Sequence, residues 1–375
     1  MKLIIRITGG LALVAALGLA APAGAQERSH ITHNEETRIV DDNGSRRMEI
    51  RSRGTVEFNE AGDWVASVGA GGQLTIEERD GGSERRLEFR PGDGAPRVRY
   101  FVNGDERALD ASGRAWAQRL VLHAVRESGL GADRRVARIR ARSGVNGVLA
   151  EIGHIRSDVG RRMYYRALLA GGAMSNGEFA RVMEDVGRRM GSDVETRLVL
   201  MEAVDRAGDG ARVASVLRAA QGIDSDVETR LVLNRVTERH RLADAASRDA
   251  FFRAVGGMGS DVERRLVLTG AADERLADGP SREAFFRAVS EFDSDVERRI
   301  VLTRILDDAS EATSIAAIAS AGEMGSDVEK RIVLSQVPAS QLRSGRVAAA
   351  YRRVAEAMRS DAERRLVMRR LNGNR

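Results

Sequence analysis

Hydrophobic and polar residues follow two different periods along this chain. Within residues 45–110 hydrophobic positions alternate with charged ones, as at Met48 and Ile50, and glycine-rich segments separate the alternating runs. The dipeptide Asn103-Gly104 favours a two-residue hairpin turn. The alternation predicts a small antiparallel β meander with one face in water, and that face is dominated by arginine and glutamate.

The period becomes helical after this segment. Trp116 and Leu120 recur at helical spacing, and Gly129 is placed to end the helix. We expect this helix to cover the apolar face of the small sheet. A further basic helix follows from Ala132, so that residues 111–155 are predicted to be connecting helices.

The strongest pattern is a repeated motif, Ser-Asp, usually followed by Val, then charged residues and a short aliphatic run. It recurs at steps of 32 to 35 residues, at Ser157, Ser192, Ser225, Ser260, Ser294, Ser326 and Ser360. A period near 34 residues accommodates two helices per unit and is typical of helical solenoids. Residues 156–375 are therefore predicted to form about seven helical hairpins. The predicted fold class is α+β by segregation, a β meander followed by an all-α solenoid.

Each motif serine is predicted to be a helix N-cap. In the copy at Ser294 the serine can accept a hydrogen bond from a free amide, and Glu297 can return one to the serine's own amide, which makes a capping box. Val296, Ile300 and Val301 are expected to form the apolar stripe of the helix. An apolar residue, expected to pack over the turn, stands two positions before each serine: Ile155, Met190, Ile223, Met258, Phe292, Met324 and Met358.

Two charged columns accompany the serines. Aspartate follows the serine in every copy, and an arginine holds the sixth position: Arg162, Arg197, Arg230, Arg265, Arg299, Arg331 and Arg365. Aspartate and arginine four residues apart share a helix face, and stacking brings the arginine of one unit near the acid of its neighbour. We expect a structural Asp–Arg ladder. The alternative is an arginine stripe that binds carboxylate or phosphate groups of a partner.

The sequence contains no pattern typical of a catalytic, metal or cofactor site. It lacks the common zinc, nucleophile-elbow, phosphate-loop, dinucleotide and EF-hand motifs. The chain has no cysteine, and acids and arginines interleave to give a formal net charge of only +5. These features predict a protein that is not an enzyme, holds no cofactor or metal, and does not bind nucleic acid.

The first residues have the pattern of a secretory signal. Lys2 and Arg6 precede an uncharged apolar run, Leu11–Ala20, and Ala23-Gly24-Ala25 offers a cleavage site. Residues 1–25 are predicted to be removed, leaving a flexible polar leader at residues 26–44 and a secreted or periplasmic protein. No later apolar segment is long enough to span a bilayer, so the processed chain is not expected to be an integral membrane protein.

The repeats resemble helical-hairpin solenoids of the HEAT type. The pattern Ser-Asp-Val-Glu-Arg-Arg-Leu-Val-Leu, after an Arg/Glu-rich β segment, is similar to bacterial extracytoplasmic repeat regions. Those regions are associated with sensor-type membrane metallopeptidases of the beta-lactam receptor family. The membrane helices and the zinc motif of that family do not occur in this sequence, so the resemblance implies a repeat architecture and no activity.

These observations favour a non-enzymatic, exported interaction or scaffold protein. Its helical array is expected to bind a protein or peptide partner in the cell envelope. The alternative function is binding of an anionic glycan or cell-wall fragment through an arginine-lined face.

The export hypothesis can be tested directly. If the signal is cleaved after Ala25, N-terminal sequencing of the protein from the periplasm or the medium should begin at Gln26. A mature chain that still begins at Met1 would contradict the assignment.

Overall fold

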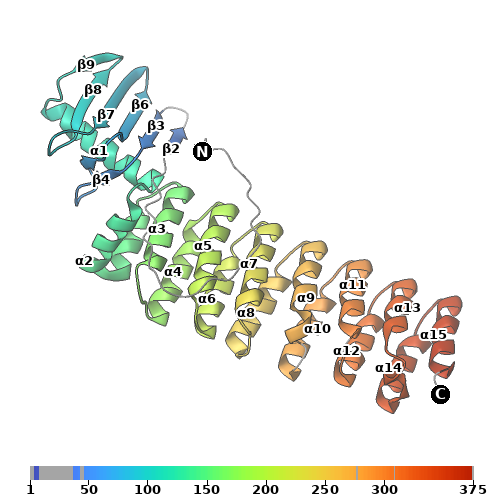
Figure 1. The fold of residues 1–375 in the computed structure, drawn as a ribbon. Coiled ribbons are helices and arrows are strands. Elements are labelled where there is room, and N and C mark those ends of the chain that lie inside the picture. The colour runs from blue at the N-terminus through green and yellow to red at the C-terminus, as the bar shows by residue number, and fades with distance from the viewer. Residues whose placement is uncertain (1–3, 8–36, 43–45, 276–277, 308, 374–375) are drawn as a thin grey trace, which may run out of the picture. The chain divides into compact units, whose positions relative to one another are not determined.

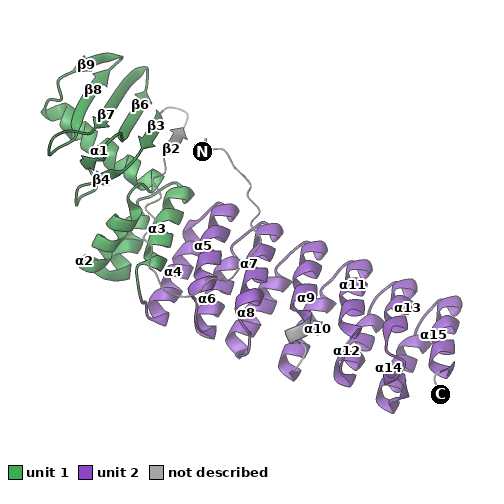
Figure 2. Cartoon of the chain, in the orientation of Figure 1, with its two compact units in different colours: residues 1–172 green, residues 173–375 purple. Residues whose placement is uncertain are grey.

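The computed structural model describes residues 4–7, 37–42, 46–275, 278–307 and 309–373. The predicted α+β class is confirmed, with a β meander followed by a helical-hairpin array (Figure 1). The chain divides into two compact units, residues 1–172 and 173–375 (Figure 2). Unit 1 contains the strands and the helices α1 to α3, and unit 2 contains α4 to α15.

The strands of unit 1 form an antiparallel sheet in the order β1-β2-β3-β6-β7-β8-β9, and β4 pairs separately with β5. Their bounds are β1 Ile4–Ile7, β2 Thr37–Asp42, β3 Arg46–Arg53, β4 Val56–Phe58, β5 Val65–Val68, β6 Gln73–Asp80, β7 Ser83–Arg90, β8 Arg97–Val102 and β9 Asp105–Arg107. The turn between β8 and β9 is Asn103-Gly104, and both residues have positive φ. This geometry is the one that the dipeptide favours in a two-residue hairpin.

Part of the predicted flexible leader (residues 26–44) is a strand in the structure. Residues 37–42 form β2 and pair with β3, with Ile39 opposite Ile50. Three β-branched residues, Thr37, Ile39 and Val40, stand in this short segment, which suits a strand once β3 offers it backbone partners. The rest of the leader lies outside the described residues. So does most of the predicted signal, except residues 4–7, which form β1 and would be lost on cleavage after Ala25.

Helix α1 (Ala111–Ser128) covers one face of the sheet, as predicted. Its Trp116 and Leu120 pack with the inward residues of the strands, such as Ile76 and Phe89. The indole Nε1 of Trp116 donates to a carboxylate oxygen of Glu78 at 2.8 Å, which satisfies a buried donor and a buried acceptor together.

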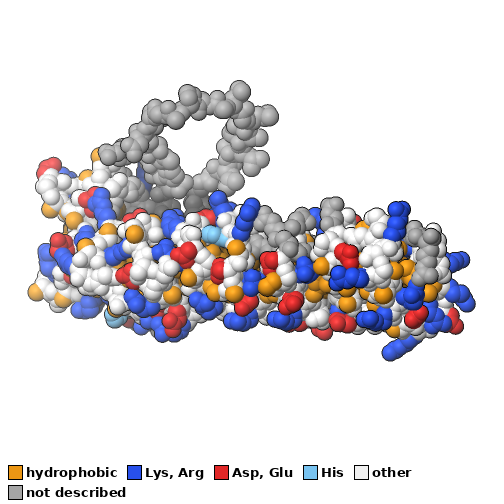
Figure 3. All heavy atoms as spheres, turned by 90° about the horizontal axis from the view of Figure 1, so that it is seen from below, with side chains coloured by type: hydrophobic (Ala, Val, Ile, Leu, Met, Phe, Trp, Pro, Cys, Tyr) orange, Lys and Arg blue, Asp and Glu red, His pale blue; other side chains and the backbone are white. Residues whose placement is uncertain are grey.

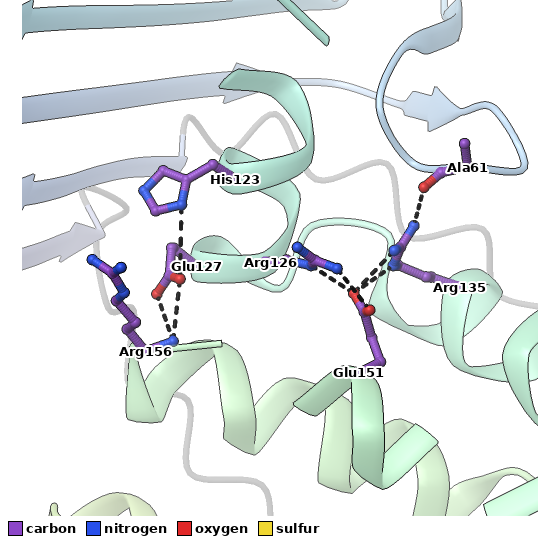
Figure 4. Close-up of polar contacts among 7 residues, drawn as sticks. All are labelled: Ala61, His123, Arg126, Glu127, Arg135, Glu151 and Arg156. Atoms are coloured by element: carbon purple, nitrogen blue, oxygen red, sulfur yellow. Dashed lines mark hydrogen bonds and ion pairs between the residues drawn. The ribbon is translucent and has the colours of Figure 1, made fainter. Parts of the chain in front are cut away.

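Helices α1 and α2 (Ala132–Ile152) are joined by one buried carboxylate, Glu151 (Figure 4). Arg126 of α1 and Arg135 of α2 both bind it, at 2.8 to 3.1 Å. Burial raises the pKa of Glu151, but the hydrogen bonds and charges of the two arginines outweigh it and hold the pKa below its usual value. Arg135 also donates to the carbonyl oxygen of Ala61, which ties in the turn between β4 and β5.

Each motif serine precedes the first helix of a repeat. We call this first helix the motif helix. The motif helices are α3 Asp158–Ala170, α5 Asp193–Arg206, α7 Asp226–Arg239, α9 Asp261–Arg275, α11 Asp295–Leu306, α13 Asp327–Gln336 and α15 Asp361–Gly373. The second helices are α4 Asn176–Arg189, α6 Gly210–Ala220, α8 Ala245–Gly256, α10 Gly279–Ser290, α12 Glu311–Gly322 and α14 Gly345–Glu356, with a short 3₁₀ turn, η1 Gln341–Arg343, before α14. Within the described residues the last motif copy consists of α15 alone.

The serine hydroxyls lie where the motif predicts them. Each accepts a hydrogen bond from the backbone N–H three residues later, at 3.1 to 3.4 Å. The apolar residue two positions before each serine is buried in all seven copies.

The capping box predicted at Ser294 does not form. The amide of Ser294 donates to Asp261 of the preceding motif helix at 2.7 Å, and Glu297 binds a different partner. A full capping box does form at Ser175, which precedes the second helix α4 and whose own amide donates to Glu178. At Ser294 an aspartate of the neighbouring repeat therefore takes the place of the glutamate in the same helix as partner of the serine amide.

This contact, an aspartate rung, repeats along unit 2. The aspartate after one motif serine accepts from the amide of the next motif serine at 2.6 to 2.8 Å; the pairs are Asp193–Ser225, Asp226–Ser260, Asp261–Ser294, Asp295–Ser326 and Asp327–Ser360. A helix N-terminus offers free amides and a positive dipole end, which makes it a good site for a carboxylate.

In unit 1 a glutamate takes the aspartate's place before the first motif copy. Glu127 of α1 accepts from the amides of Ser157, at 2.7 Å, and Arg156, at 3.1 and 3.2 Å (Figure 4). The close approach also explains Gly160 at the motif's glutamate position. A Cβ there would stand 2.4 Å from the carbonyl oxygen of Arg126, so a side chain does not fit.

Acid should weaken the aspartate rungs. The Ser360 amide above all, with Lys330 and the Arg359 amide, lowers the pKa of Asp327. A carboxyl whose pKa is lower in the folded state stabilises the fold above its unfolded pKa, about 3.9, and loses that contribution as pH falls through the folded pKa. Asp327→Asn should therefore lower the free energy of unfolding by about 1 kcal/mol at pH 7 and flatten its decline in acid. Denaturant titrations at pH 7 and below pH 4 measure both effects.

Asp293→Asn is the matched control, because Asp293 is exposed and takes no part in a rung. Equal effects of the two substitutions would contradict the role given to Asp327.

Candidate functional site

The exposed hydrophobic residues of the described chain gather on the motif helices. The large hydrophobic side chains that are exposed there are Val194, Leu198, Val227, Val262, Leu266, Val296, Val328 and Leu366. Each stands at position three or position seven of its motif copy. A few scattered exposed hydrophobic residues are normal on a protein surface, but these share one face of their helices.

The predicted core stripe at the Ser294 copy was therefore wrong in part. Val296 is 45% exposed, whereas Val301 and Leu302 are fully buried. At 3.6 residues per turn, position 296 lies about 140° around the helix from position 301, so the two cannot face the same side. Ile300, about 40° from Val296, lies beside it and is half-buried.

Two columns result, which we call the valine column and the leucine column. The valine column consists of Val194, Val227, Val262, Val296 and Val328, each 45 to 46% exposed. The leucine column, one helical turn later, consists of Leu198, Leu231, Leu266, Ile300, Ile332 and Leu366, of which Leu198, Leu266 and Leu366 are exposed and the others half-buried. Residues at i and i+4 are neighbours on a helix, so the columns run side by side.

Folding alone gives little reason for these valines. Valine is less favourable than alanine inside a helix by roughly 0.5 kcal/mol, because the preceding turn restricts its side chain. A valine that leaves nearly half of its side chain in water also gives up part of the free energy gained by burial. The recurrence of valine in five successive motif helices calls for another explanation.

The arginine column lies between these hydrophobic positions and is paired, though not with the predicted partner. Each arginine donates through Nε to the position-four glutamate of the next copy; the pairs are Arg197–Glu228, Arg230–Glu263, Arg265–Glu297, Arg299–Glu329 and Arg331–Glu363. The expected Asp–Arg pairing was wrong. The aspartates are already held by the serine amides, so the glutamates are left for the arginines.

The C-terminal end of the arginine column differs from its middle. Arg162, at the other end, lies in unit 1 and is half-buried. Arg365, in α15, is exposed and has no ion-pair partner among the residues that the structure describes. The column therefore contains five paired arginines inside unit 2.

Position five, which the sequence analysis passed over, points into the array. Its residue is buried in five copies, as Thr196, Thr229, Arg264, Arg298 and Lys330. Arg264 donates to the carbonyl oxygens of Met258 and Glu291, and Arg298 to Glu323 at 2.5 Å. The sequence shows that position five changes from threonine to a basic residue along the array. It does not show that these side chains are buried. These arginines link the motif helices to the turns of neighbouring repeats.

Two hollows open between second helices of unit 2. One, of about 790 Å³, lies among α6, α8 and α10 and is lined by small residues together with Arg253, Arg287 and Glu291. The other, of about 530 Å³, lies between α4 and α6 around Gly187 and Arg218. Neither brings together a nucleophile, a base and an orienting group of the kind that catalysis needs.

The described part of the chain also contains no cluster of three or more metal-ligating side chains and no helix with the length and apolar character needed to cross a membrane. In the space-filling view of Figure 3, basic, acidic and hydrophobic side chains alternate along the array, without a large area of one sign. The face seen in that view therefore offers no broad attraction for a polyanion.

Comparison of the chain with protein-family models, with curated proteins and with solved structures gives no match.

The Arg–Glu pairing predicts a measurable coupling. Arg265 and Glu297 are each about one-fifth exposed, so removing one partner leaves the other half-buried and unpaired. Arg265→Ala should lower the free energy of unfolding by about 1 kcal/mol, and a double-mutant cycle with Glu297→Ala should give a coupling of about 0.5 to 1 kcal/mol.

Arg365→Ala is the control in the same column, since Arg365 is exposed and unpaired among the described residues. It should change the free energy of unfolding by less than about 0.5 kcal/mol. A cycle at Arg265 and Glu297 with no coupling would rule out the ladder as a stabilising contact.

Proposed function

We propose that this chain is a non-enzymatic interaction protein of the cell envelope, and that its array binds a protein partner along the valine and leucine columns. One observation supports the proposal most. All the large hydrophobic side chains that are exposed in the described residues stand in these two columns. The location in the envelope rests on the signal pattern of residues 1–25.

The dimensions of the columns suit a protein surface. Packed helices lie about 8 to 10 Å apart, so the four spacings between five successive valines extend over roughly 32 to 40 Å. Standard protein interfaces involve some 20 to 30 residues a side and have an apolar centre with polar surroundings. The two columns supply hydrophobic groups at regular intervals, and the Arg–Glu pairs supply polar groups between them.

The paired state of the arginines bears on the alternative, an anionic glycan bound by the array. A carboxylate or phosphate would have to displace a glutamate that already accepts from each arginine. Those pairs are only about one-fifth exposed, so the exchange would also disturb the stacking of repeats. A partner that contacts the hydrophobic columns leaves every pair in place. The protein partner is therefore the better supported of the two.

A charged substitution in the valine column should abolish partner binding without unfolding the array. In Val262→Asp/Val296→Asp each new carboxylate stands at the second residue of a motif helix, where the helix dipole favours it. Capture of the partner from a cell-envelope extract should fall by about tenfold or more, because two apolar contacts become buried charges. Quantitative mass spectrometry of material bound to the purified protein measures the loss.

Ala246→Asp/Ala312→Asp is the matched control. Both alanines are exposed and also stand second in their helices, α8 and α12, but they lie outside the columns. The control should capture the same proteins as the unaltered chain. If the valine variant, folded by circular dichroism, also does so, the proposal is wrong. Sedimentation of the purified protein shows separately whether a second copy covers the columns.

A further inference from the structure

The face of the sheet that α1 does not cover, here called the outer face, is a lattice of charged side chains. Most of its described arginines have a carboxylate beside them; the shortest contacts are Arg51–Glu49 at 2.5 Å, Arg79–Glu77 at 2.7 Å, Arg86–Glu88 at 3.3 Å and Arg99–Glu106 at 2.6 Å. Phe101 on this face is buried between two guanidinium groups, those of Arg86 and Arg99, 4.2 and 4.8 Å from its ring centre.

At one end of the outer face the arginines outnumber the carboxylates. Arg90 and Arg97 lie directly opposite one another on β7 and β8, and Arg53 pairs in register with Gln73 on β3 and β6. Because Leu74 lies opposite Phe89, the same register brings Gln73 opposite Arg90. The row Arg53, Gln73, Arg90 and Arg97 therefore crosses four adjacent strands. We call it the arginine edge.

The arginines of this edge are poorly neutralised. All three are exposed, and Arg53 and Arg97 have no ion-pair partner among the described residues. Arg90 is 3.9 Å from a carboxylate oxygen of Glu88, and the same oxygen is 3.7 Å from Arg99. Like charges directly opposite on neighbouring strands destabilise a sheet. The edge therefore carries a cost that an anionic ligand would remove.

We propose that the arginine edge binds a linear anionic polysaccharide. Adjacent strands lie about 4.8 Å apart, so the row places three guanidinium groups along a line of roughly 15 Å on an open surface. A guanidinium binds carboxylate and phosphate groups bidentately. Gln73, a half-buried amide between the cations, is a group that can hydrogen-bond sugar hydroxyls. A single small anion would reach only part of this row.

Two other polyanions fit the surface less well. An anionic membrane would be expected to take up hydrophobic side chains, and residues 47–172 of unit 1 expose no large hydrophobic side chain. Single-stranded nucleic acid stacks its bases on accessible aromatic rings. Phe101 is enclosed by arginines, and the half-buried Trp64 and Phe58 pack on the sheet core. The inference goes beyond the proposed function and does not depend on the columns of unit 2.

The test is a binding titration of the purified protein with polygalacturonate, which carries carboxylates, and with phosphomannan, which carries phosphates. Monomeric galacturonate, neutral dextran, anionic phospholipid vesicles and single-stranded DNA serve as comparison probes. At least one anionic polysaccharide should bind, more weakly as salt is raised, and much more tightly than the monomer. Arg90→Gln/Arg97→Gln should lower its affinity by about tenfold or more.

Arg47→Gln/Arg79→Gln is the matched control. These arginines also lie opposite one another on neighbouring strands of the outer face, but at its other end, and Arg79 is held by Glu77 and Glu84. Both double variants lose two charges, so the control should keep nearly the full affinity. The proposal is overturned if the two variants weaken binding equally, if neither polysaccharide binds, or if vesicles or DNA bind more tightly. Thermal unfolding of each variant establishes that it is folded.

Discussion

The array depends on how the free backbone amides at the start of each motif helix are satisfied. The first amides of a helix have no partner within it, and burying them unpaired is costly. Here the serine hydroxyl takes the amide three residues on, while the serine's own amide donates to an aspartate of the preceding repeat. A motif helix is therefore completed only when its predecessor is in place. Helix initiation and repeat stacking become one event, which couples neighbours as expected for a linear array.

The remaining charges follow from this constraint. The amide of Ser294 is occupied by Asp261, so Glu297 does not close a capping box. It binds Arg265 instead. Each of the five interfaces between adjacent motif copies inside unit 2 thus has at least one charge-to-amide contact and at least one ion pair. Unit 1 uses the same device at the first copy, where Glu127 replaces the aspartate and Gly160 makes room for α1.

The features that were predictable from the sequence are those that one segment determines by itself. The period near 34 residues, the serine caps and the alternation of Met48 with Ile50 are local patterns, and the structure has the elements they indicate. The partners of the charges were not predictable. Aspartate and arginine four residues apart on one helix look like a pair, and only the offset between neighbouring helices decides that each binds elsewhere. The exposed columns were missed for a related reason, since Val296 and Val301 were grouped without regard to the angle between them.

The motif separates into positions that stacking requires and positions that it does not. Serine, aspartate, glutamate and arginine join the repeats, and the residues at positions eight and nine, such as Val301 and Leu302, fill the core. Position three makes none of these contacts and is nearly half exposed, so a polar residue of higher helix propensity than valine would fold at least as well there and be more soluble. The arginine edge is similar, because Arg90 lies opposite Arg97 without close carboxylates such as those that bind Arg79, and this costs stability that a mixed pair would not. Where a chain repeatedly departs from what folding favours, the reason lies in contacts made with another molecule. The hydrophobic columns and the arginine edge are two described surfaces where that reasoning applies. The columns favour an apolar partner surface, and the edge favours an anionic one.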